Sequence, residues 1–514
     1  MSEGKPDLEH GIDPYDPDGR DMPTPEFRRH GRDLVEWIAD YLENSRQHQV
    51  AAGCEPGELQ RLLPNTGPVE GESMEAILAD FKGVVLPRVS HWNHPHFHAY
   101  FSVSSSGPGI LGELLTAVLN VNAMLWKSCP AATELEQITA AWVLHWLGLP
   151  GSWFGMILDS ASTAVLQAMV SARQRVEPQS RAIGPSGKLT AYISEQTHSS
   201  VEKAAIAAGI GQSNVRRIGV DTCFRMDPQR LAQTIGDDVA RGHRPFFAVA
   251  TVGTTSSTAV DPVIEIADIC RANGIWLHVD GAYGGSFGLV PECRHFLDGV
   301  ERADSFVVNP HKGMMVPLDC SLFYTAHPDI LRDAFSLEAE YLRTDVEAVD
   351  FMDYGLALGR RFRALKLWFV LRYFGRNGLV ANLRESLGMA AWLADKIAGD
   401  TRLELAAPVT MGLVCCRVRR GDSATRELMR RINGSRDFFV SQTALDGKVV
   451  MRVAIGNIRT RQQDIEELWS SILDILDEIE ANCRRTGPSG AGHRSPRCSP
   501  MDQMEWTAKR DKLT

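Results

Sequence analysis

Apolar residues recur at three- and four-residue steps in the first ninety residues, a spacing that predicts helices. One helix is expected over residues 27–42, where Leu34 and Ile38 share a face, and a second over residues 73–87. We therefore expect residues 26–95 to form a helical arm that packs against another part of the molecule. Residues 1–25 are rich in Asp, Gly and Pro and are expected to be disordered.

Short apolar runs alternate with amphipathic helices from about residue 155 onward. Asp227 and Asp261 each precede a proline and are expected to cap the helices that follow them. Apolar runs separated by helices are typical of a mostly parallel sheet with helices on both faces. The chain is therefore predicted to be α/β, with a large domain over residues 96–370. The strands are expected at residues 188–194, 215–220, 245–252, 275–280 and 305–309, with helices at 199–209, 228–240 and 262–273 between them.

The pattern changes after about residue 370 to helix, strand, helix and hairpin. A strand is expected over residues 412–419, and a hairpin over residues 438–456 turns at Asp446-Gly447. Residues 371–485 are therefore predicted to form a small α+β domain. Residues 486–514 are rich in Gly, Pro and Ser and are expected to be a disordered tail.

Composition and charge narrow the class of protein. The 514 residues exceed what one compact core usually holds, and the 44% hydrophobic content is that of a globular protein. The net charge of −10 argues against a protein that coats nucleic acid or an anionic membrane. No signal peptide or membrane span is found, and the ten cysteines are scattered, which suits a reducing compartment. We expect a cytoplasmic protein without nucleic-acid or membrane partners.

Polar residues follow two predicted strands, at the edge where parallel sheets bind ligands. Asp280 ends one strand, and Lys312 follows the next one along the chain. A lysine partly removed from water can form a Schiff base, and a buried carboxylate can hold a protonated pyridine nitrogen. Pyridoxal phosphate (PLP) needs both of these roles from a protein. Residues 160–163, at a predicted helix start, could bind its phosphate, and His198 could stack on its ring.

Each of these features has a commoner explanation when it is taken alone. A lysine after a strand is usually solvated, Asp280 could hydrogen-bond a loop, and residues 160–163 could be an ordinary helix cap. Other enzyme classes fit less well. Residues 209–214 lack the third glycine of a dinucleotide-binding fingerprint and follow a helix. Ser162 lacks the flanking glycines of a serine hydrolase.

Several segments together resemble the PLP-dependent group II decarboxylases, most closely the aromatic L-amino acid decarboxylases. They are residues 130–136, 197–204, 277–286, 304–312 and 358–369. The resemblance implies the type I fold of PLP-dependent transferases, PLP as the cofactor, and a homodimer with interlocked N-terminal arms. The implied reaction converts an L-amino acid, above all an aromatic one, to the amine and CO2. An aldehyde synthase or an acidic amino acid decarboxylase remains the alternative within this fold, and a non-catalytic PLP-fold binding protein the alternative outside enzymes.

The resemblance also implies roles for individual residues. Lys312 would bind the cofactor covalently, Asp280 would pair with the pyridine nitrogen, and His198 would stack on the ring opposite Ala282. Tyr341 would protonate the substrate carbon after CO2 leaves; relatives with phenylalanine there form an aldehyde. The other implied cofactor contacts are Ser160, Ala161, Ser162 and Asn309 at the phosphate, Thr255 beside the ring and His311 beside the lysine. The implied substrate contacts are Ser90, Trp92 and His198.

Two further features depart from the family or stand outside it. Gly313 follows the lysine, where the aromatic decarboxylases usually carry tryptophan. His94, His96 and His98 alternate along the chain and would share one face of an extended segment, an arrangement that can bind zinc. No carboxylate or thiol lies nearby in the sequence, so pocket lining is the commoner explanation, and no metal site is predicted.

Overall fold

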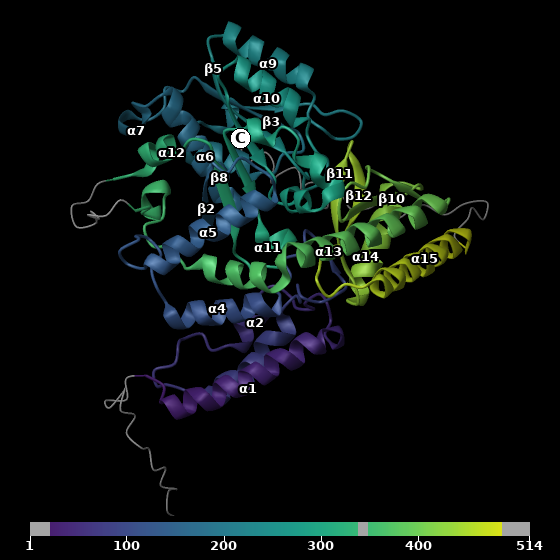
Figure 1. The fold of residues 1–514 in the computed structure, drawn as a ribbon. Coiled ribbons are helices and arrows are strands. Elements are labelled where there is room, and N and C mark those ends of the chain that lie inside the picture. Colours follow the sequence, from purple (N-terminus) through teal and green to yellow (C-terminus); the bar gives the residue numbers. More distant parts are fainter. Residues whose placement is uncertain (1–20, 338–347, 486–514) are drawn as a thin grey trace, which may run out of the picture.

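The computed structural model describes residues 21–337 and 348–485, and a seven-stranded sheet lies at its centre (Figure 1). The strand order is β2-β8-β7-β6-β5-β3-β4. Neighbouring strands are parallel except at β8, which is antiparallel to both β2 and β7. The strands are β2 (Phe154–Leu158), β3 (Leu189–Ser194), β4 (Val215–Ile218), β5 (Arg244–Thr251), β6 (Trp276–Asp280), β7 (Ser305–Val308) and β8 (Ser321–Thr325).

Both faces of this sheet are covered by helices, as the apolar runs predict. All five residues of β6 are buried. One core cluster joins the sheet to α5 (Pro130–Trp146), α9 (Pro228–Ala240), α10 (Val263–Ala272) and α13 (Arg363–Gly399). A second cluster joins the opposite face to α6 (Ala161–Val176), α8 (Ser200–Ala207) and α12 (Pro328–Phe335). The predicted α/β class is therefore confirmed.

The two aspartates expected to cap helices behave differently. Asp227 caps α9, because its side chain accepts hydrogen bonds from the backbone N–H groups of Gln229 and Arg230. The prediction for Asp261 was wrong. Its buried carboxylate accepts from the N–H groups of Met226 and Thr251 and so braces the end of β5, and burial raises its pKa to about 6.

A smaller sheet carries the C-terminal part of the chain, in the order β1-β11-β12-β10-β9. Helices α14 (Asp422–Ser435) and α15 (Gln462–Arg485) cover it together with the second half of α13. Its strands are β1 (Phe97–His98), β9 (Leu403–Leu405), β10 (Leu413–Val418), β11 (Phe439–Leu445) and β12 (Lys448–Ala454). The sequence-based division differs from this arrangement, since β1 pairs with β11 although it precedes the large domain. Helix α13 also crosses the expected boundary at residue 370, with a kink at Gly375 (φ 59°).

The N-terminal helices lie on the side of the molecule away from the central sheet. Helix α1 (Thr24–Glu43), purple in Figure 1, lies below α2 (Glu58–Leu62) and α4 (Gly107–Leu119). The expected helix over residues 73–87 is α3 (Met74–Asp80), which continues as a π-helical turn and then a 3₁₀ turn. The short helices α7 (Ser180–Ile183) and α11 (Pro310–Gly313) complete the α-helices of the described ranges. Across residues 21–337 and 348–485, each helix is too short or too polar to cross a bilayer.

Candidate active site

A cavity of about 200 Å³ opens at the carboxyl ends of β5, β6 and β7. Its walls include each of the ten residues that the resemblance assigns to the cofactor. These are Ser160, Ala161, Ser162, His198, Thr255, Asp280, Ala282, Asn309, His311 and Lys312. Parallel strands bring these residues together from widely separated parts of the chain, because their carboxyl ends meet at one edge of the sheet.

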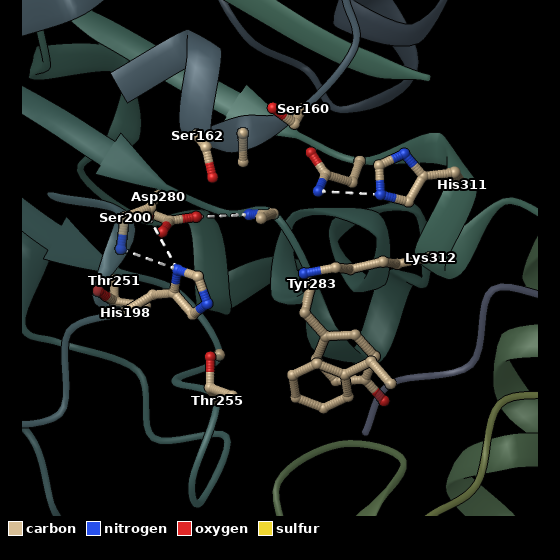
Figure 2. Close-up of a pocket in the computed structure, with 15 residues that line it drawn as sticks. Ser160, Ser162, His198, Ser200, Thr251, Thr255, Asp280, Tyr283, His311 and Lys312 are labelled. Carbon is tan, nitrogen blue, oxygen red and sulfur yellow. Dashed lines mark hydrogen bonds between the residues drawn. The ribbon is translucent and has the colours of Figure 1, made fainter. Parts of the chain in front are cut away.

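Lys312 and Asp280 project into the cavity from the ends of two neighbouring strands (Figure 2). Asp280 ends β6, and one of its carboxylate oxygens accepts a hydrogen bond from the Ala282 N–H at 3.0 Å. Lys312 lies on α11, directly after β7. Burial lowers the pKa of Lys312, while the carboxylate of Asp280 acts in the opposite direction. A lysine with a lowered pKa has more of the neutral amine that attacks a carbonyl.

The start of α6 forms another wall. Ser160 is the N-cap of this helix, and its Oγ accepts a hydrogen bond from the Thr163 N–H at 3.3 Å. Ser160 thus caps the helix, and residues 160–162 also line the cavity. Asn309 stands nearby with a buried side-chain oxygen that has no protein partner among the described residues. The Nδ2 group of Asn309 lies 3.3 Å from His311 Nε2. Exposed N–H groups at a helix start suit an anion such as phosphate.

Two stacked aromatic rings form part of the opposite wall. The rings of Phe101 and Tyr283 are nearly parallel, with centroids 3.7 Å apart. The Nζ atom of Lys312 lies 5.6 Å from the centroid of Phe101. These rings give the cavity an apolar side next to the lysine.

Five further residues of the wall are not among the site residues that the sequence predicts. They are Phe101, Ser200, Thr251, Gly253 and Tyr283. Thr251 and Gly253 stand at the end of a predicted strand and could have been found by the rule that identified Asp280. Phe101 follows β1 in another part of the chain, and its tertiary contacts, above all the stacking on Tyr283, place it here.

Two predicted substrate residues do not line this cavity in the described chain. Ser90 Oγ accepts a hydrogen bond from the Ala52 N–H, and Trp92 stacks on Phe97 with centroids 4.4 Å apart. Tyr341 lies outside the described residues. The departure at Gly313 has a local reason, since a Cβ atom there would lie 2.4 Å from Ser286 Cβ.

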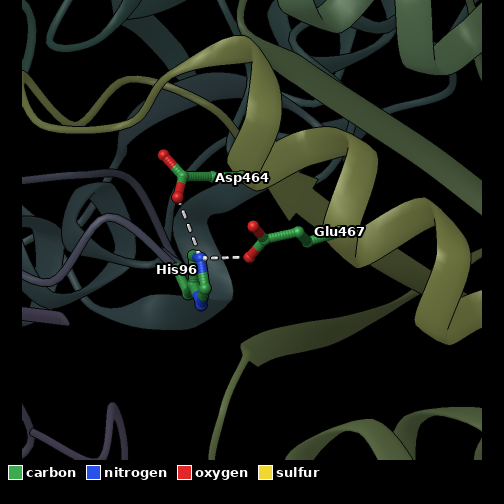
Figure 3. A group of neighbouring side chains, drawn as sticks. All are labelled: His96, Asp464 and Glu467. Atoms are coloured by element: carbon green, nitrogen blue, oxygen red, sulfur yellow. Dashed lines mark hydrogen bonds and ion pairs between the residues drawn. The ribbon is translucent and has the colours of Figure 1, made fainter. Parts of the chain in front are cut away.

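The alternating histidines do not converge on one ligand position. His94 accepts a hydrogen bond from the His96 N–H, and His98 Nδ1 lies 3.3 Å from the carbonyl oxygen of Ala454. His96 instead lies beside Asp464 and Glu467, at 2.9 and 3.5 Å (Figure 3). These three side chains are spaced as metal ligands could be. Asp464 is already paired with Arg46, so protein partners alone account for the group.

The cavity fits PLP by the chemistry of its walls. An electron-withdrawing pyridinium needs an anion, an aldehyde needs an amine, and a phosphate needs donors. Asp280, Lys312 and the start of α6 supply these three groups around one space.

Comparisons with known proteins agree with this chemistry. The family model described as "Pyridoxal-dependent decarboxylase conserved domain" matches residues 56–419. The chain is 39% identical to phenylacetaldehyde synthase of Arabidopsis thaliana over 88% of this chain and 96% of that protein. It is 38% identical to aromatic-L-amino-acid decarboxylase of Manduca sexta, over 88% and 92% of the two chains. The solved structure of TDC from Oryza sativa with PLP and tryptamine superimposes with a TM-score of 0.87 at 34% identity, over 90% and 99% of the two chains. This chain therefore belongs to the pyridoxal-dependent decarboxylase family.

Proposed function

We propose that the protein decarboxylates an aromatic L-amino acid to the corresponding amine and CO2, with PLP as its cofactor. The observation that carries this function is the convergence of Lys312 and Asp280 in one cavity that also contains the start of α6. Family membership and the named relatives support the reaction class and an aromatic substrate.

PLP, when bound, supplies the electron sink that accepts the bonding electrons of the departing CO2. The protein orients the reactants and places charge around them. Asp280 would hold a proton on the ring nitrogen, since its carboxylate is nearly buried and faces the cavity. Lys312 would provide the amine that holds the cofactor, and the Ser160–Ser162 segment with Asn309 would hold the phosphate. The stacked rings of Phe101 and Tyr283 offer an apolar surface near the lysine.

The main question about the product is whether it is an amine or an aldehyde. Of the two relatives named above, one is an aldehyde synthase and the other is a decarboxylase. An aldehyde synthase consumes O2 and water and releases aldehyde, CO2, ammonia and hydrogen peroxide. Tyr341 favours the amine, since the aldehyde-forming relatives carry phenylalanine at the matching position. The other alternative within the family is a decarboxylase for acidic amino acids. The apolar wall beside Lys312 argues against this alternative, because it offers no partner for an acidic side chain.

One set of assays tests the reaction and the substrate class together. The purified protein would be given phenylalanine, tyrosine, tryptophan, 3,4-dihydroxyphenylalanine and glutamate, each with and without added PLP. CO2, amine, aldehyde, ammonia and oxygen uptake would all be measured. We expect CO2 and amine in equal amounts from at least one aromatic substrate, and no turnover of glutamate. Oxygen uptake equal to CO2 release would show that the protein is an aldehyde synthase and not a decarboxylase. A purified chain that shows no PLP absorbance after PLP is added would contradict both of these functions.

We further propose that the active enzyme is a homodimer, with a second copy of the chain on the exposed face of α4. Five large apolar side chains of this helix are each more than two-fifths exposed: Leu111, Leu114, Leu115, Val118 and Leu119. An apolar patch of this kind is costly in water. The opposite face of α4 already packs on α13, where Gly112 lies against Lys366. Within residues 21–337 and 348–485 these five side chains stay exposed, so a second copy of the chain could cover them.

Light scattering on two variants tests the dimer. Leu114→Glu with Val118→Glu places two charges on the exposed face of α4 and should give a monomer. Ile183→Glu, at a side chain that is 81% exposed on α7, is the matched control and should leave the dimer intact. A wild-type chain that is monomeric at micromolar concentration would contradict the proposal.

The cellular location is proposed from the sequence. The scattered cysteines suit the reducing cytoplasm, where we propose that the enzyme works. Fractionation of cells that express the full chain, followed by immunodetection, tests this location.

A further inference from the structure

Asn309 and His311 contact each other through their side chains in the wall of the cavity. Asn309 is 3% exposed and His311 is 5% exposed. The Nδ2 atom of Asn309 lies 3.3 Å from His311 Nε2, whereas Asn309 Oδ1 is buried without a hydrogen-bond partner in the described chain. Asn309 precedes α11, but its side chain makes no capping hydrogen bond to that helix. Among the described residues, His311 is therefore the group that can orient this amide.

The other ring nitrogen of His311 shows where the ring carries its proton. The backbone nitrogen of Cys320 lies 3.0 Å from His311 Nδ1 and donates its N–H to that atom. A backbone N–H can only donate and cannot turn away, so Nδ1 accepts and carries no proton. Burial lowers the pKa of His311 to about 4, so the ring is neutral at pH 7. A neutral ring carries one N–H, which is therefore at Nε2.

The proton on Nε2 determines which way the Asn309 amide faces. With Nδ2 toward His311, two N–H donors meet and Oδ1 stays unpaired, which is costly in a buried site. A half-turn of the amide about its last side-chain bond exchanges Oδ1 and Nδ2 in nearly the same space. Oδ1 then accepts the Nε2–H of His311, and Nδ2 takes the place of the unpaired oxygen.

The direction of the amide matters because the neighbouring wall suits an anion. Figure 2 shows Ser160, Ser162 and His311 at the same end of the cavity. An amide oxygen beside a phosphate would repel it, whereas an amide N–H donates a hydrogen bond to it. The phosphate and the Nε2–H of His311 therefore favour the same orientation of Asn309.

We propose that His311 is a positioning residue that donates its Nε2–H to Asn309 Oδ1 and so directs the Asn309 NH2 group toward the phosphate of PLP. The proposal rests on PLP as the cofactor of the proposed function. A purely structural role is the competing explanation, since His311 also accepts the Cys320 N–H and stands next to Lys312. Such a role would weaken the binding of pyridoxal, which has no phosphate, as much as the binding of PLP.

The test measures the dissociation constants of PLP and of pyridoxal by titrating each into the full chain and following absorbance. The variants are His311→Phe, Asn309→Ala, the two combined, and His311→Gln, whose amide can also donate an N–H. His278→Phe is the matched control, because His278 is a buried histidine of the neighbouring strand β6 that does not line the cavity. A second readout is the side-chain ¹⁵N spectrum of the wild-type holoenzyme with labelled histidines, with His311 assigned through His311→Gln.

We expect His311→Phe to weaken PLP binding about two- to tenfold, the range of one neutral hydrogen bond, and to leave pyridoxal binding unchanged. Asn309→Ala should weaken PLP binding about ten- to hundredfold, the range of a hydrogen bond to a charged group, and adding His311→Phe should weaken it no further. His311→Gln should bind PLP more tightly than His311→Phe does. In His278→Phe the ratio of the two dissociation constants should equal that of the wild type.

Equal weakening of PLP and pyridoxal binding in His311→Phe would overturn the proposal, and so would additive effects of the two substitutions. A proton on Nδ1 of His311 in the wild-type spectrum would overturn it as well, and that measurement does not require His311→Phe to fold. Both readouts are taken without an amino acid substrate, so a failure to decarboxylate is seen separately.

Discussion

Lys312 and Asp280 stand at the ends of two neighbouring strands and point into the same cavity (Figure 2). Burial lowers the pKa of Lys312 and so favours its neutral amine. The carboxylate of Asp280 acts in the opposite direction and makes the lowering smaller. The pair therefore combines a lysine that can attack an aldehyde with a carboxylate that can hold a cationic ring. Because the two roles are separate, substitutions at the two positions should fail in different ways.

Lys312→Ala should abolish the covalent attachment of PLP. After borohydride reduction, the mass of the wild-type chain should rise by that of the reduced cofactor, and the variant should show no increase. Lys127→Ala is the control, since Lys127 is exposed and does not line the cavity. A reduced adduct on the Lys312→Ala chain would place the attachment at another lysine.

Asp280→Asn should keep the size of the side chain and lose its charge. Part of the bound PLP should remain, because the phosphate end of the site is untouched. Turnover should fall by about 10²–10³, the usual cost of losing a well-placed electrostatic contact. Cofactor content by absorbance and kcat in saturating PLP separate these two effects. If kcat stays near the wild-type value, Asp280 does not stabilise the ring nitrogen.

Tyr341→Phe should change the product. A phenol can deliver a proton to the substrate carbon after CO2 leaves, and phenylalanine cannot. We therefore expect less amine, and more aldehyde, ammonia and oxygen uptake for each CO2 released. Amine, aldehyde, ammonia, CO2 and oxygen uptake would all be measured in one assay. Tyr373→Phe is the control, because Tyr373 is an exposed tyrosine. Unchanged product ratios would show that Tyr341 is not the proton donor.

The central sheet could be predicted from the sequence because its pattern is strong. Strands such as β6 are buried on both faces, so they appear as continuous apolar runs between helices with clear caps. Elements whose place depends on tertiary contacts could not be found this way. β1 has only two residues, and its pairing with β11 joins positions 97 and 439. The antiparallel strand β8 has no distinguishing local signal.

The same difference applies to the site. Asp280, Asn309 and Lys312 follow strands, so a topological rule identifies them. Phe101 and Ser200 are not among the predicted site residues, for different reasons. Phe101 reaches the cavity through tertiary contacts such as its stacking on Tyr283, which no local pattern encodes. Ser200 lines the cavity because the start of α8 brings it beside His198, and residue types alone do not reveal this contact.

Asp464 provides a last prediction, about stability rather than catalysis. Its buried carboxylate joins the start of α15 to the N-terminal segment, with hydrogen bonds from His96 at 2.9 Å and from Arg46 Nη2 at 3.0 Å. Burial alone would raise the pKa of Asp464, but these hydrogen bonds outweigh it and hold the pKa well below its usual value. The folded chain therefore binds a proton at this site more weakly than the unfolded chain. The resulting stabilisation is complete above the unfolded pKa and is lost as the pH falls further.

Asp464→Asn should accordingly lower the free energy of unfolding at pH 7 by about 1–3 kcal/mol, the cost of leaving a buried partner unsatisfied. The difference from wild type should be constant above about pH 5 and narrow below about pH 4, where the unfolded carboxylate also takes up a proton. Urea denaturation of both proteins at pH 7, 5 and 3.5, at one protein concentration, measures this difference in the free energy of unfolding. Asp474→Asn, at an exposed position on the same helix, is the control and should stay within about 0.5 kcal/mol of wild type throughout. A deficit in Asp464→Asn that is equal at all three pH values would mean that the charge of Asp464 does not stabilise the fold.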